Sequence, residues 1–188
     1  CPVMFITSSN DFHSAFARIY QSMDLLPHQN WRVTSNLHAN HGPGPEQWVL
    51  LNLWFQEHLA GRELNIPKTP PSTFKIENGR AHFSVIPSSL DRLVETEIYY
   101  SYDPNCVTRF WKRASATREG DTWKANFKVH SQLPIYAFAL CRYRLAQAEP
   151  LERGNTTTSF TLNSDLHTHI PEDIDLGAMT RLPKTGLV

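Results

Sequence analysis

The chain has 188 residues, of which 40% are hydrophobic and 19% charged, a composition typical of a soluble globular protein with one large domain or two small ones. Its 18 Lys and Arg residues balance 18 Asp and Glu residues, and no dense basic run occurs, which excludes the charge pattern of a nucleic-acid-binding protein. No apolar stretch reaches the roughly 18 to 20 residues that a membrane span requires. We therefore predict a soluble protein with no cofactor, no nucleic-acid partner and no membrane span, and we leave a secreted or periplasmic location open.

The first third of the chain alternates predicted strands and helices. Residues 3–7 are continuously apolar, as in a strand covered on both faces, and residues 31–37 form a second short strand. Apolar residues at spacings of three and four predict an amphipathic helix over 12–26. A second helix is predicted over 46–60, with a proline near its start and a glycine just past its end. This order predicts part of an α/β domain over residues 1–66.

The character of the sequence changes after this segment. A proline-rich stretch at 66–71 is typical of a stiff linker. Short alternating runs bounded by turn residues then predict strands at 73–76, 81–86, 93–102, 107–115, 123–129 and 135–145. Strands at this spacing predict an antiparallel sandwich of immunoglobulin-like type over residues 67–147. Residues 148–188 are interpreted as an extended C-terminal tail.

Two polar residues follow the two predicted N-terminal strands. Asp11 comes just after the first strand and His38 just after the second. Because the carboxyl ends of parallel strands meet at one edge of a sheet, we expect these side chains to lie on the same edge. In an acyl-transfer triad, a histidine takes the proton of the nucleophile while a buried aspartate fixes the histidine tautomer. The competing interpretation is that Asp11 caps the following helix and His38 is an incidental loop residue.

Three segments resemble a known family. The runs VMFITSSNDF (3–12), NLHANHGPG (36–44) and FQEHLAG (55–61) are similar to the C-terminal third of bacterial α/β-hydrolases of the dienelactone-hydrolase, acetyl-xylan-esterase and prolyl-oligopeptidase-like group. Members with an appended β-sandwich are similar further along, at residues 99–101, 109–111 and in the strand that contains Trp123.

The resemblance implies both a fold and a catalytic apparatus. The implied fold class is α/β, the C-terminal portion of an α/β-hydrolase sheet, followed by an all-β immunoglobulin-like sandwich. The implied activity is that of a serine hydrolase, with Asp11 as the triad acid and a histidine of the 38–41 loop as the base. His38 is favoured because it follows the strand directly, as the base usually does in such hydrolases. His41 is the alternative, because it precedes a Gly-Pro-Gly run that in the resembling sequences follows a histidine closely.

The nucleophile of such a triad, a serine in a Gly-x-Ser-x-Gly elbow, does not occur in the sequence. We therefore predict the C-terminal portion of a serine hydrolase that cleaves carboxylic esters, or peptides, with its serine supplied by an N-terminal hydrolase segment of the same parent chain or by a second polypeptide. Two parallel strands alone would expose a hydrophobic edge, which also favours such a partner. The chain alone is predicted to be inactive. The alternative is a non-catalytic module derived from the hydrolase fold that binds carbohydrate or protein.

Two further patterns are weaker. Asp165, His167 and His169 alternate, and such residues share one face of a strand, where they could hold a metal ion. We favour a solvated tail and predict no metal site. Trp111 and Trp123 could form a sugar-stacking platform, but core positions are favoured for aromatic residues in alternating strands.

Overall fold

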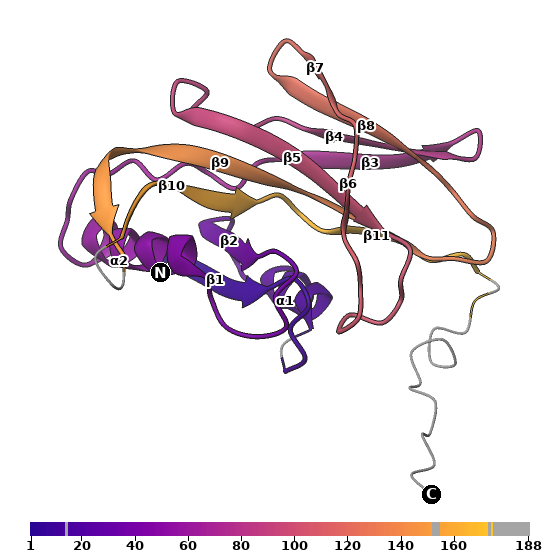
Figure 1. The fold of residues 1–188 in the computed structure, drawn as a ribbon, viewed down its shortest axis with the longest axis horizontal. Coiled ribbons are helices and arrows are strands. Elements are labelled where there is room, and N and C mark those ends of the chain that lie inside the picture. The colour runs from indigo at the N-terminus through magenta and orange to yellow at the C-terminus, as the bar shows by residue number, and fades with distance from the viewer. Residues whose placement is uncertain (14, 152–154, 173, 175–188) are drawn as a thin grey trace, which may run out of the picture.

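The computed structural model describes residues 1–13, 15–151, 155–172 and 174. Within these residues, eleven strands and two helices form a mainly β architecture with two antiparallel sheets and one short parallel pair (Figure 1). The expected α/β fold class is therefore wrong, and all-β describes the chain better. No helix in the described part of the chain is long and apolar enough to cross a lipid bilayer.

The parallel pair consists of β1 (Val3–Ser8) and β2 (Trp31–Asn36), aligned residue for residue along their whole length. The helix between them, α1 (Phe16–Met23), is shorter than predicted and has no side-chain hydrogen bond at its N-cap. Its buried residues recur at spacings of four and three, as expected for an amphipathic helix: Phe16, Tyr20 and Met23.

The second helix, α2 (Pro45–His58), begins at a proline, whose missing N–H costs nothing in the first turn. The Gln47 side chain turns back and its Oε1 accepts a hydrogen bond from the Gly44 N–H at 2.9 Å. A glutamate in the first turn, Glu46, complements the positive end of the helix dipole. These features fix the point at which the loop after β2 enters the helix.

One antiparallel sheet has the order β3-β4-β8-β7. Its strands are β3 (Ser72–Glu77), β4 (Arg80–Val85), β7 (Thr117–Glu119) and β8 (Thr122–Lys128). The β3–β4 hairpin turns at Asn78-Gly79, where both residues have positive φ angles, of 50° and 70°. This is the turn chemistry that suits the right-handed twist of two antiparallel strands.

The other antiparallel sheet has the order β10-β9-β5-β6, and β11 pairs with another part of β9. Its strands are β5 (Leu93–Ser101), β6 (Lys112–Arg113), β9 (Ile135–Pro150), β10 (Thr156–Asn163) and β11 (His167–His169). The predicted strand at 107–115 is reduced to the two residues of β6. Conversely, residues that the sequence assigns to the tail form β10 and β11, while residues 175–188 of that tail lie outside the described residues.

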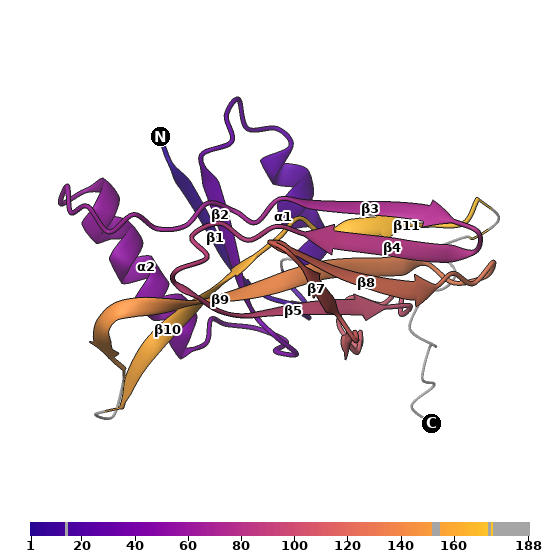
Figure 2. The ribbon, with the colours of Figure 1, turned by 90° about the horizontal axis from the view of Figure 1, so that it is seen from above.

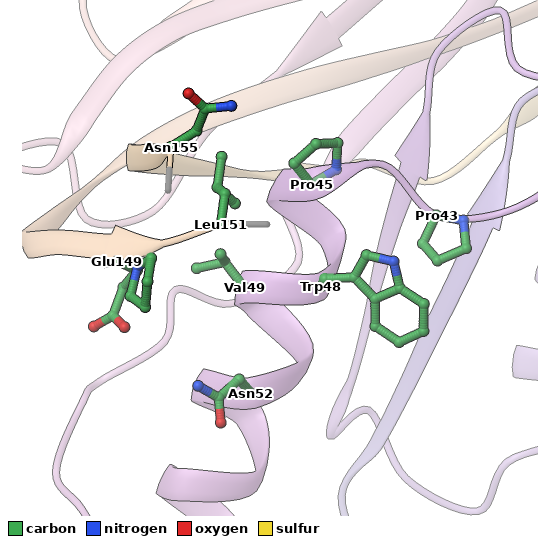
Figure 3. A pocket seen from close by; sticks show the side chains of 9 residues that line it. Pro43, Pro45, Trp48, Val49, Asn52, Glu149, Leu151 and Asn155 are labelled. Atoms are coloured by element: carbon green, nitrogen blue, oxygen red, sulfur yellow. The ribbon is translucent and has the colours of Figure 1, made fainter. Parts of the chain in front are cut away.

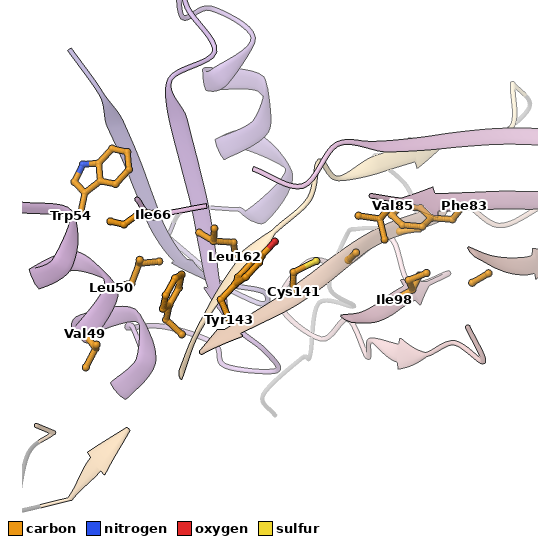
Figure 4. Packing of buried hydrophobic residues seen from close by; sticks show 14 of the residues in the cluster. Val49, Leu50, Trp54, Ile66, Phe83, Val85, Ile98, Cys141, Tyr143 and Leu162 are labelled. Carbon is orange, nitrogen blue, oxygen red and sulfur yellow. The ribbon is translucent and has the colours of Figure 1, made fainter. Parts of the chain in front are cut away.

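The sheet containing β9 is a middle layer. Ala137, Ala139 and Cys141 belong to a hydrophobic cluster shared with α2 and the β3-β4-β8-β7 sheet. The alternate residues Phe138 and Leu140 belong to a second cluster, shared with α1 and β2. Figure 2 shows the two antiparallel sheets beside the β1–β2 pair, and Figure 4 shows the first cluster running from Leu50 of α2 to Val85 of β4. Residues 135–141 of β9 are therefore buried on both faces, which explains their uninterrupted apolar sequence.

The packing of β2 explains why the expected α/β sheet does not form in this chain. β1 and β2 remain a two-stranded pair, and β2 lies against β10 rather than beside a further parallel strand. The hydroxyls of Thr34 and Thr161 are 3.4 Å apart, and the Ser35 N–H donates to Asn163 Oδ1 at 3.2 Å. Polar residues of β10 are thus buried because β2 satisfies their hydrogen bonds.

Candidate functional site

A buried polar turn follows β1. Ser8, Ser9, Asn10 and Asp11 are each at most 5% exposed. The Ser9 hydroxyl donates to Asn10 Oδ1 at 2.8 Å and accepts the His38 backbone N–H at 2.8 Å. Because buried polar groups are costly unless they are hydrogen-bonded, this network fixes the turn and the loop after β2 relative to each other.

The Asp11 carboxylate is held through both of its oxygens. Oδ1 accepts the backbone N–H of His13 at 2.7 Å, and Oδ2 lies 3.1 Å from Nδ1 of His41. The carboxylate side chain is only 7% exposed, whereas the His41 side chain is 57% exposed. A shielded aspartate therefore orients an accessible imidazole.

Aromatic rings surround His41. The Phe12 ring centroid lies 5.3 Å from that of His41, and the His13 ring lies 5.0 Å away in an edge-on arrangement. Since Nδ1 is occupied by Asp11, Nε2 is the nitrogen that can exchange a proton with a reacting group.

His38, which the sequence favours as the base, takes a different position. Its ring stacks on Phe110 with a centroid distance of 5.0 Å and an interplanar angle of 27°. Its backbone has a φ angle of 59°, an uncommon conformation for a residue other than glycine. The structure thus brings His41 rather than His38 onto Asp11, although both histidines belong to the same loop.

This arrangement supports one kind of chemistry. A histidine whose Nδ1–H is bound by a carboxylate presents its other nitrogen as a general base, and the carboxylate stabilises the imidazolium that forms. No hydroxyl or thiol within the described residues is hydrogen-bonded to His41. Within the described residues, the Asp11–His41 pair therefore has no hydrogen-bonded nucleophile.

His167 and Trp111, which belong to the two weaker sequence patterns, pack within the folded structure. His167 Nε2 lies 2.9 Å from the Ser72 hydroxyl, and its ring stacks on Phe74. Burial lowers the pKa of His167. No group of three potential metal ligands occurs within the part of the chain that the structure describes. Trp111 is 1% exposed and belongs to the core.

Sequence reasoning missed the contribution of the loop between β5 and β6. Asn10 Nδ2 donates to the backbone carbonyls of Val107 and Arg109, and Trp111 Nε1 lies 3.4 Å from the Ser9 carbonyl oxygen. These contacts join residues about 100 positions apart, so no local pattern could have revealed them.

Two cavities adjoin the loop that carries the histidines, but neither is lined by Asp11 or by either histidine. The larger, of about 400 Å³, lies between the start of α2 and the end of β9. Figure 3 shows the Trp48 ring on the side of Pro43, with Glu149 on the other side of the helix. The smaller, of about 350 Å³, is lined by the end of β2 and by β5. The Asp11–His41 pair therefore lies outside both cavities.

The chain matches no protein-family model, and no curated protein or solved structure matches it significantly. Together with the predominance of antiparallel strands, this overturns the resemblance to the C-terminal part of an α/β-hydrolase. The similarity rested on short runs around two strands and a helix, whereas the described chain has far more strand than helix, 43% against 13%. The case for a function consequently depends on the Asp11–His41 geometry itself.

Proposed function

We propose that Asp11 and His41 form the acid–base half of an acyl-transfer site that hydrolyses carboxylic esters, with peptides as a second substrate class. The observation that supports this is the contact of 3.1 Å between Nδ1 of the exposed His41 and Oδ2 of the buried Asp11. His41 Nε2 would take the proton of the nucleophile and later give it to the leaving group. Asp11 would hold the required tautomer and stabilise the positive charge on the ring.

In this proposal the nucleophilic serine comes from a polypeptide segment that pairs with β1. Among the described residues, β1 pairs only with β2, so its other edge offers backbone groups to a further strand. Residues 3–6 are apolar but only partly buried, as expected for a strand that lacks a neighbour. A strand added parallel to β1 would end at the same edge as Asp11, and a serine following it would lie beside His41.

The solvent-exposed face of α2 also favours a partner polypeptide at β1. Trp48, Phe55 and Leu59 are 55%, 50% and 79% exposed, and the helix contacts β1. Residues seven and eleven positions apart lie on one side of a helix, so these side chains form an apolar surface on a helix that contacts β1. Such a surface is typical of an interaction site.

The test is labelling with a fluorophosphonate, which reacts with activated serines. The protein is isolated in its native form, together with any polypeptide joined or bound to it, and compared with an Asp11→Asn variant. We expect labelling of a serine outside this chain and a loss of labelling rate on the order of 10⁴-fold in the variant, because the asparagine selects the wrong histidine tautomer. Native material that does not label, or that labels equally well in the variant, would refute the proposal.

A second candidate is a carbohydrate-binding module, and the cavity beside α2 favours it. The cavity is lined by a half-exposed indole, Trp48, on the side of Pro43 and by the polar side chains of Asn52, Glu149 and Asn155 elsewhere. An aromatic face with nearby hydrogen-bonding groups suits a sugar ring. This function would be favoured over hydrolysis if the fluorophosphonate does not label the native protein and the native protein binds oligosaccharides saturably. A Trp48→Ala variant should then lose this binding.

A further inference from the structure

The loop from residue 102 to residue 111, which joins β5 to β6, is anchored next to the Asp11 turn. Its backbone carbonyls at Val107 and Arg109 accept hydrogen bonds from Asn10 Nδ2, and the Trp111 indole N–H donates to the Ser9 carbonyl. Ser9 in turn binds the His38 backbone N–H at 2.8 Å. A loop of the antiparallel sheet and the two loops of the acid–base site therefore form one hydrogen-bonded unit.

A buried cation makes this loop rigid. Arg109 is 3% exposed, and its guanidinium carbon lies 3.6 Å from the ring centroid of Tyr136. Its Nε donates to the Asp103 carbonyl at 2.7 Å and its Nη2 to the Pro104 carbonyl at 3.1 Å. Burial lowers the pKa of Arg109, a cost that these contacts offset. Hydrogen bonds thus hold the backbone in place before Arg109, at Asp103 and Pro104, and the Trp111 side chain after it.

Phe110, the next residue, points away from this anchor. It is 64% exposed even though both of its neighbours are almost fully buried. Its ring lies on His38, while Phe12, which is 53% exposed, lies against His41. The Phe110 ring thus packs against His38 and is otherwise open to solvent. The two exposed rings are positioned at the two histidines of the site.

We infer that Phe110 and Phe12 form an aromatic subsite that binds an aryl group of the substrate beside His41. This inference rests on the proposed function, and it assigns the substrate class as esters that carry an aryl group. Phe12 with His41 and Phe110 with His38 each offer an aryl group edge-on or offset contacts, the arrangements that aromatic pairs favour. Phe110 and Phe12 are then specificity-determining residues, supplied by segments about 100 positions apart.

The test uses the full chain and the product of such an ester. The ring signals of His38 and His41 are followed by NMR during titration with 3-phenylpropionate and, as the matched aliphatic acid, with propionate. We expect saturable shifts of both rings with 3-phenylpropionate and much weaker effects with propionate. A Phe110→Ala variant should bind 3-phenylpropionate roughly two- to tenfold more weakly, the range expected for the loss of one ring pair.

Two control variants separate the possible outcomes. Val94, another exposed apolar residue, lies at the far end of β5, so Val94→Ala should bind like the original chain. Asp11→Asn should keep 3-phenylpropionate binding even though it loses the proposed labelling, which distinguishes a failed subsite from a failed catalytic pair. Equal binding of the two acids, absence of binding, or unchanged affinity in Phe110→Ala would overturn the inference.

Discussion

Replacing Phe138 with alanine tests whether the middle sheet holds the molecule together. Phe138 is fully buried, and its ring lies 5.1 Å from Phe16, 4.8 Å from Trp111 and 5.9 Å from Tyr99 between centroids. It therefore joins α1, the β5–β6 connection and β5 at one point. Removing a buried phenylalanine costs about 3 to 5 kcal/mol, and the three ring contacts place this case at about 4 kcal/mol.

This loss is large compared with a typical total stability of about 5 to 15 kcal/mol. The free energy of unfolding is measured by urea denaturation, followed by tryptophan fluorescence and by circular dichroism. Phe138→Leu, which keeps most of the apolar volume, should cost less than about 1.5 kcal/mol and remains measurable if the alanine variant does not fold. A loss below about 1 kcal/mol in Phe138→Ala would refute the three-layer packing.

Three other predictions address buried groups and the loop after His41. Cys141 should react with iodoacetamide only after unfolding, because burial raises the pKa of its thiol to about 12; labelling in native buffer followed by peptide mass spectrometry checks this. Burial lowers the pKa of His167 from its ordinary value of 6.5, so the unfolded chain binds a proton there more readily than the folded chain does. The free energy of unfolding should therefore decrease as the pH drops below 6.5, and this pH dependence should be weaker in His167→Asn. Gly44→Ala should cost about 1 to 3 kcal/mol in thermal unfolding, because its Cβ would lie 2.7 Å from Oε1 of the buried Gln47.

The local elements of the first third of the chain could be predicted from sequence, but their assembly could not. Apolar runs and helix-ending residues indicated β1, β2 and α2 close to their observed bounds. The same signals do not say how many strands a sheet will have. The choice of β10 as the neighbour of β2 depends on hydrogen bonds such as Thr34 to Thr161, which join residues 127 positions apart.

β10 itself was missed because its sequence is polar where it is buried. The run of threonine and serine at 156–159 lacks the alternation of apolar and polar residues that marks a half-buried strand, and Asn163 is an unusual residue for a strand. Asn163 is nevertheless fully buried, since it bonds both the Ser35 backbone and the Ser35 hydroxyl. Tertiary hydrogen bonds override local preference here.

For the candidate site, the sequence indicated that Asp11 and the 38–41 loop lie together, because both follow neighbouring parallel strands. It did not indicate which histidine would reach Asp11. That depends on the left-handed backbone at His38, with φ of 59°, and on the Phe110 ring that holds His38 away. Neither feature has a local sequence signal.

The most direct measurement compares two equivalent substitutions in this loop, His41→Asn and His38→Asn. Asparagine tolerates the left-handed backbone at His38, so neither change should disturb the fold. The rate of fluorophosphonate labelling is measured for each variant in the native protein with any bound polypeptide. We expect that His41→Asn loses labelling by at least about 10³-fold while His38→Asn stays within a few-fold of the original rate. Loss of labelling in His38→Asn with full labelling in His41→Asn would contradict this expectation.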